Sequence, residues 1–81
     1  MTEEEIDKLL MLCEHLRGEA GAELFALSLQ RNSASFILEE IAKEKVAQSN
    51  LLRKALIQLG CRAPGPEWEI VGYKLEPVPG T

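Results

Sequence analysis

The chain has 81 residues, of which 46% are hydrophobic and 27% are charged; this is the composition of one small globular domain and not of a disordered tail. Thirteen acidic residues against nine basic ones give a net charge of −4. An acidic, evenly mixed surface argues against binding to nucleic acid or to an anionic membrane, because both need clustered lysines and arginines.

The first residues carry no signal for secretion or membrane insertion. Acidic residues follow Thr2 at positions where a signal peptide carries basic ones. The longest apolar run, residues 9–13, is far shorter than the ~20 residues of a membrane span. Cys13 and Cys61 have no metal-ligand spacing and predict free thiols. We therefore expect a cytoplasmic protein.

The first predicted helix spans about residues 3–31. Thr2 and Glu5 have the spacing of a capping box at its start. Behind them, apolar residues recur with helical spacing, namely Ile6, Leu9, Leu10, Cys13, Leu16, Ala20, Leu24 and Leu27. Gly18 and Gly21 interrupt this stretch at a cost of about 1 kcal/mol each relative to alanine. Because the apolar phase continues across both glycines, we expect one long helix and not two short ones.

The second predicted helix spans about residues 34–59. Residues 32–35 provide a turn and an N-cap, and Gly60 provides the C-cap. Its predicted buried face consists of Phe36, Ile37, Ile41, Ala47, Leu51, Leu52, Ala55, Leu56 and Leu59. A short turn makes two such helices an antiparallel hairpin. The predicted fold is therefore all-α, with a helical-hairpin domain over residues 1–60.

Residues 61–81 form a separate tail. Pro64 and Pro66 prevent the helix from continuing. Residues 68–75 are β-prone, with Trp68, Ile70, Val71, Tyr73 and Leu75, but this segment is too short to form a sheet alone. We expect it to lie extended across the helices, burying Trp68, or to pair with a strand of a protein partner.

The apolar residues of both predicted helices cover a wider face than one helix–helix contact can hide. Five leucines are expected beside that contact: Leu10, Leu24, Leu38, Leu52 and Leu56. An exposed apolar band of this length is unusual for a monomer. Pairing two hairpins into a four-helix bundle covers the band, and a dimer is the commonest closed arrangement. We therefore expect a homodimer or a larger homo-oligomer.

Three glutamates fall on or beside the predicted apolar faces. Glu23 lies between Ala20 and Leu27, while Glu40 and Glu44 lie on the second helix, and Glu23 and Glu44 are nearly level when counted from the turn. Buried carboxylates are costly unless they are neutralised. Three arrangements would satisfy them: solvation at the edge of the face, a shared hard metal ion, or salt bridges to Arg17, Arg31, Lys43 or Lys45.

The second helix carries the segment EEIAKEKVA (Glu39–Ala47) and ends on Leu-Gly at residues 59–60. Over residues 36–60 it resembles the ExxH-bearing helix of ferritin-like and rubrerythrin-like proteins. The resemblance implies a four-helix bundle, completed by dimerisation of single hairpins, that binds two iron or manganese ions. It implies Glu44 as the motif's glutamate, with Ala47 where the histidine stands, and Glu23, or Glu19 in its place, as the glutamate of the first helix.

No motif indicates catalysis. The serines and cysteines lack the partners of a nucleophile, and His15 is a lone histidine on a helix. The sequence therefore predicts a non-catalytic, self-associating structural or partner-binding module without a cofactor. Two alternatives stay open: a ferritin-like protein that binds iron or manganese through Glu23, Glu40 and Glu44, and a hairpin that captures an amphipathic helix in its groove.

Overall fold

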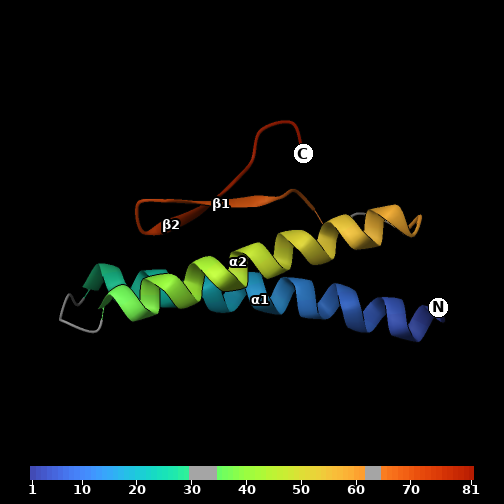
Figure 1. The fold of residues 1–81 in the computed structure, drawn as a ribbon, viewed down its shortest axis with the longest axis horizontal. Helices are drawn as coiled ribbons and strands as arrows, with labels where there is room; N and C mark the ends of the chain where they lie inside the picture. Colours follow the sequence, from blue (N-terminus) through green and yellow to red (C-terminus); the bar gives the residue numbers. More distant parts are fainter. Residues whose placement is uncertain (30–34, 62–64) are drawn as a thin grey trace.

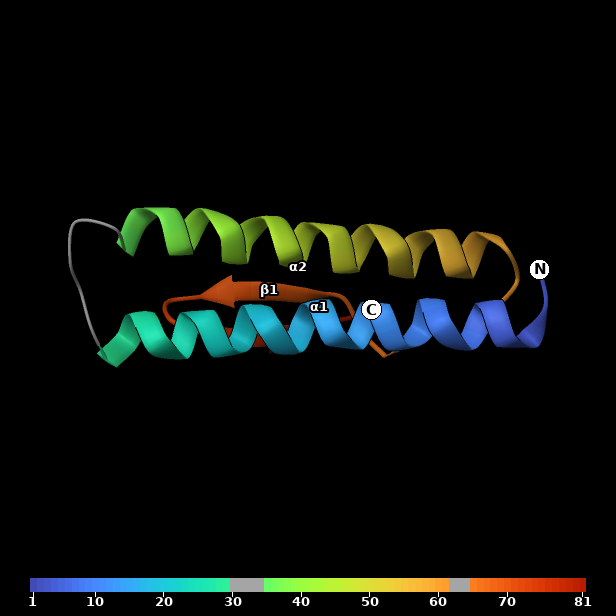
Figure 2. The same cartoon turned by 90° about the horizontal axis from the view of Figure 1, so that it is seen from below.

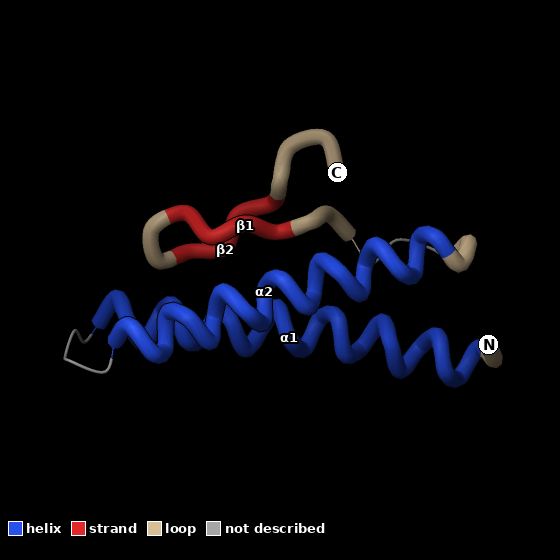
Figure 3. Tube along the Cα trace, viewed as in Figure 1, coloured by secondary structure: helices blue, strands red, loops and turns tan. Residues whose placement is uncertain are grey.

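The computed structural model describes residues 1–29, 35–61 and 65–81. Helix α1 (Glu3–Leu29) and helix α2 (Ser35–Gln58) run antiparallel and pack along each other (Figure 1). Two short strands, β1 (Trp68–Val71) and β2 (Lys74–Pro77), form a β-hairpin (Figure 3). The predicted helical hairpin is confirmed, but the fold is mostly helical and not all-α because the tail forms a small sheet.

The elements form two layers. The β-hairpin lies along one face of the helix pair, and the view from below shows the two helices side by side with β1 behind them (Figure 2). No other element in the part of the chain that the structure describes covers the opposite helical face. Neither α1 nor α2 combines the length and the apolarity that crossing a membrane requires.

Helix α1 begins as predicted and is continuous. The Glu5 amide donates to Thr2 Oγ1 at 3.2 Å, and the Thr2 amide donates to Glu5 Oε1 at 3.5 Å, which confirms the capping box. The helix passes through Gly18 and Gly21 without a break, because packing against α2 outweighs their low helix propensity. The predicted turn at residues 32–34, together with Arg31 and Pro64, lies outside the described residues.

The buried face of α1 agrees with the prediction, whereas that of α2 does not. Cys13, Ala20, Leu24 and Leu27 are buried on α1, and α2 buries Ala42, Val46, Ser49 and Leu56. Of the apolar residues predicted for the buried face of α2, only Leu56 is buried. Leu52 is half-buried, and the other seven are exposed: Phe36, Ile37, Ile41, Ala47, Leu51, Ala55 and Leu59. Ala42 and Ser49 form the contact because small side chains let two helix backbones approach closely.

The five leucines expected beside the helix contact have different environments. Leu24 and Leu56 are fully buried within it, at 1% and 0% exposure. Leu10 and Leu52 are half-buried, and Leu38 is 40% exposed. The helix pair therefore hides more of its apolar surface than the sequence suggested, although part of it stays in solvent.

Two small buried residues join the helices by reciprocal hydrogen bonds. Ser49 Oγ donates to the Cys13 carbonyl oxygen at 2.9 Å, and Cys13 Sγ donates to the Ser49 carbonyl oxygen at 3.3 Å. Both residues are at most 5% exposed, so these bonds form in a low-dielectric interior where they are strongest. Cys13 and Cys61 are free thiols, as predicted.

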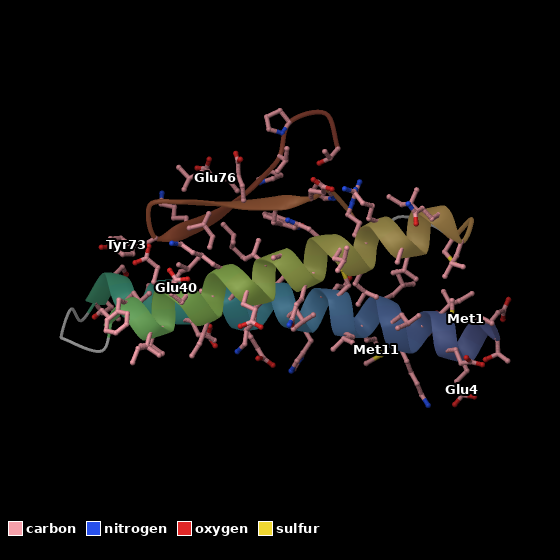
Figure 4. The ribbon with its side chains drawn as sticks, viewed as in Figure 1. Met1, Glu4, Met11, Glu40, Tyr73 and Glu76 are labelled. Carbon is pink, nitrogen blue, oxygen red and sulfur yellow. The ribbon has the colours of Figure 1, made fainter. Side chains whose placement is uncertain are left out.

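The β-prone tail forms two strands that pair with each other, whereas one extended segment was predicted; a protein partner for this segment stays a prediction. Val71 pairs with Lys74 across the two-residue turn Gly72–Tyr73. Gly72 has φ +64°, the left-handed conformation that a type II′ turn needs at its first central position. Tyr73 lies at this turn, where the hairpin comes down towards the helices (Figure 4), and packs with Ile70 and Leu75 against the helical core.

Side chains of the helices hold the β-hairpin by its first strand. The Trp68 amide donates to Asn50 Oδ1 at 3.0 Å, and Asn50 Nδ2 donates to the Trp68 carbonyl oxygen at 2.8 Å. The Arg17 guanidinium lies 4.9 Å above the centre of the Trp68 ring, a cation–π distance. Arg53 Nε donates to the Gly65 carbonyl oxygen at 2.7 Å. Asn50 thus acts as a substitute for a neighbouring strand at β1.

The helix contact predicts a large loss of stability for Leu24→Ala. Because Leu24 is fully buried, truncation should lower the free energy of unfolding by about 2–5 kcal/mol. Leu51→Ala, at a leucine that is 68% exposed, should change it by no more than about 0.5 kcal/mol. Urea denaturation followed by circular dichroism at one protein concentration measures both, and equal losses would contradict the assigned core.

The Asn50 contact predicts that Asn50→Ala loosens the β-hairpin while both helices remain. The variant removes two hydrogen bonds, each with a net contribution of about 1 kcal/mol. Trp68 is the one tryptophan of the chain, so its fluorescence emission should shift to longer wavelength at unchanged helical ellipticity. The exposed Gln48 provides the control variant Gln48→Ala. An emission maximum that stays at the wild-type position would show that Asn50 does not hold the strand.

Candidate functional site

The structure places the three predicted metal ligands in different surroundings. Glu23 is half-buried on α1 and accepts a hydrogen bond from Lys45 Nζ. Glu40 is exposed and accepts from Lys43 Nζ at 3.2 Å, and Glu44 is exposed. Within the described ranges, no three His, Cys, Asp or Glu side chains converge as metal ligands. Glu23 is paired in a salt bridge with Lys45, and binding of iron or manganese by these residues stays a prediction.

The most concentrated polar contact of the helix pair is centred on Lys45. Its Nζ donates to Glu19 Oε2 at 2.8 Å and to Glu23 Oε1, so one α2 lysine bridges two α1 carboxylates. His15 Nε2 lies 2.8 Å from the other oxygen of Glu19. The sequence indicated Lys45 as a salt-bridge candidate for the core glutamates, but it did not indicate that both carboxylates share the same lysine.

The network shifts the protonation equilibria of its members. The hydrogen bond and the charge of Lys45 lower the pKa of Glu19 from its ordinary value of 4.5. In turn, the hydrogen bonds from Lys45 to Glu19 and Glu23 raise the pKa of the lysine above 10.5, against the opposing effect of desolvation. The lysine and Glu19 therefore stay charged over a wider pH range than isolated side chains.

Exposed apolar residues lie on the same helical side as this network, which is opposite to the β-hairpin. Asn50, Arg17 and Gly21 contact the β-hairpin, whereas Lys45 reaches α1 from the other side. Positions four, seven, eight and fourteen residues from Lys45, and seven from Glu19, share this side because of helical spacing. We call the exposed apolar residues at these positions the open face: Leu12, Ile37, Leu38, Ile41 and Leu59.

The Lys45 network divides the open face into two apolar ends. Ile37, Leu38 and Ile41 lie towards the connection between the helices, Leu12 and Leu59 towards the chain start, and the Lys45 network lies between them. The hollow between the helices and Trp68 has a volume of only about 10 Å³, which is enough for one water molecule. The apolar ends of the open face are suited to docking of another apolar surface.

The Lys45 network predicts that Lys45→Met changes the pH dependence of stability. Because the folded-state pKa of Glu19 is lowered, the contribution of this pair is fully present above the unfolded pKa, and it is lost as pH falls through the folded pKa. The stability difference between wild type and variant should therefore be largest near neutral pH and shrink below about pH 4.

Urea denaturation across pH 3 to 7, at a single protein concentration, provides this measurement. Lys43→Met is the matched control, since Lys43 forms only exposed ion pairs with Glu39 and Glu40, which contribute little to stability. A difference that stays constant over this range would contradict the assigned coupling between Lys45 and Glu19.

The site consists of a cross-helix ion network within a partly apolar, solvent-exposed helical face. None of its described residues forms a nucleophile–base pair, because His15 contacts only the Glu19 carboxylate among the ion pairs of this face. No family model, curated protein sequence or solved structure matches this chain.

Proposed function

We propose that this chain is a self-associating helical module, and that two copies pair through their open faces into a four-helix bundle. The observation that carries the proposal is the row of exposed apolar side chains on the helical face opposite the β-hairpin. Its members are between 37% and 61% exposed to solvent. Single exposed leucines are ordinary on protein surfaces, but a row along one face marks an interaction site.

The surface area of the chain supports the same proposal. A monomer of 9.0 kDa has a typical accessible surface of about 4,850 Å², whereas this elongated chain exposes 5628 Å². The excess of about 800 Å² equals what one partner buries in an interface of standard size. A second copy on the open face would bring the exposed surface per chain close to that of a compact protein.

The charges of the open face are compatible with burial by a second copy. Lys45 is bonded to Glu19 and Glu23 within its own chain, so burying it does not strand a cation, which would be strongly destabilising. An antiparallel dimer places the apolar end around Ile41 of one copy against the apolar end around Leu12 of the other. The open face is thus complementary to itself in polarity.

A protein partner for the segment 68–75 stays a prediction with less support. β1 uses one edge to pair with β2, and the backbone of Trp68 on the other edge bonds to Asn50. The outer edge of β2 contains Pro77, which has no amide hydrogen to offer an incoming strand. For this reason we assign the assembly to the helices.

The proposal predicts that Ile41→Glu weakens association. A carboxylate at position 41 would be buried without a partner on pairing, at a cost that exceeds the gain from the remaining contacts. We expect wild-type protein at micromolar concentration to contain at least two chains and the variant to contain half as many. Sedimentation equilibrium measures both masses, and circular dichroism checks that the helices are intact.

Phe36→Glu is the matched control, because Phe36 is 65% exposed and, at nine residues from Lys45, lies half a turn round α2 from the Lys45 network. It should leave the mass of the assembly unchanged. A wild-type chain that sediments as a single 9.0 kDa species over the whole concentration range would overturn the proposed function.

A further inference from the structure

A second apolar row runs along α1 on the side turned away from α2. It alternates steps of four and three residues, the heptad spacing of a helix–helix seam. Its large apolar members are highly exposed: Met11 at 69%, Phe25 at 63% and Leu29 at 71%. No described element lies beyond this side of α1 in the view from below (Figure 2), and Met11 points away from the β-hairpin (Figure 4). We call this row the outer seam: Met11, His15, Gly18, Ala22, Phe25 and Leu29.

The fold of the single chain gives no reason for a glycine at position 18. A Cβ added to Gly18 would meet nothing within 4 Å, whereas one at Gly21 would lie 3.7 Å from Leu75 Cδ1. A glycine inside a helix lowers its stability relative to alanine. Around Gly18 and Ala22 the surface of α1 forms a shallow hollow, where the backbone of another helix can approach closely.

The outer seam is complementary to its own copy in an antiparallel arrangement. A two-fold axis at the level of Ala20 exchanges Met11 with Leu29, so large side chains meet at both ends. The same axis exchanges Gly18 with Ala22, which places small residues opposite each other in the centre. His15 then faces Phe25, and an imidazole and a phenyl ring can stack.

The charges beside the outer seam fit the same register. This register places Glu14 opposite Ala26 of the second copy, and Glu19 opposite Gly21 of the second copy. No two carboxylates therefore lie directly opposite each other, where like charges would oppose pairing. Glu19 is in addition paired with Lys45 within its own chain and contacted by His15.

We propose that α1 pairs antiparallel with α1 of a second copy through the outer seam, so that open-face dimers join into tetramers. The stoichiometry of four rests on the proposed function, whereas the outer-seam contact itself does not. Two different symmetric interfaces on two sides of one chain generate a closed tetramer when their axes intersect at right angles.

Sedimentation equilibrium of four proteins tests both interfaces: wild type, Phe25→Glu, Ile41→Glu and the double variant. We expect four chains for wild type, two for each single variant and one for the double variant. If Phe25→Glu has the mass of wild type while Ile41→Glu halves it, the outer seam is refuted and the proposed function stands. The converse refutes the open face alone, and a monomeric wild type refutes both.

Gly18→Leu separates the loss of the outer-seam contact from misfolding of the single chain. Open space surrounds Gly18 and leucine favours the helix, so the single chain should become at least as resistant to urea as wild type. We nevertheless expect Gly18→Leu to sediment as two chains, because the bulky side chain prevents close approach at the centre of the outer seam. Four chains for Gly18→Leu would contradict the outer seam, and Phe36→Glu, at a residue that is 65% exposed on the other side of α2, should keep four chains as the matched control.

Discussion

The close contact of α1 and α2 through small side chains determines the rest of the structure. Ala20 and Ala42 are fully buried, and Cys13 and Ser49 bond reciprocally across the helices. A contact made by small residues brings the backbones together, but it is narrow and leaves most large side chains at its margins. Several large apolar residues of α2, such as Ile37 and Ile41, are therefore directed to the sides of the helix pair.

The β-hairpin covers only one of these sides. Ile70, Tyr73 and Leu75 extend the helical core on that side, and Asn50 fixes the first strand to α2. On the other side the same narrow contact leaves Ile37 and Ile41 in solvent, around a lysine that is already paired. Because the tail packs on one side only, the helix pair has one side covered by the β-hairpin and one side whose apolar residues are exposed to solvent.

Much of this arrangement could be predicted from the sequence, and the exceptions have physical causes. The capping box and the face of α1 followed from local spacing, because Leu24 and Leu27 are both large and buried. The face of α2 could not be found by counting large side chains, since Ala42 and Ser49 contribute little hydrophobicity and are selected by backbone proximity. Residues 68–75 were recognised as β-prone, but not as two strands joined at Gly72, because the left-handed turn there is evident only when the flanking residues are considered as a pair of strands. Lys45 was a candidate partner for Glu23, but the register that lets it reach Glu19 as well is a tertiary property.

The two cysteines differ in whether a reagent can reach them while the helices stay packed. Cys61 is partly accessible just beyond α2, while Cys13 is closed off between the helices with its sulfur bonded to Ser49. A thiol reagent consequently distinguishes two events on a single chain: modification of Cys61 requires no rearrangement, whereas modification of Cys13 requires α1 and α2 to part. The rate at which Cys13 is modified therefore measures how often α1 and α2 separate, without any added label.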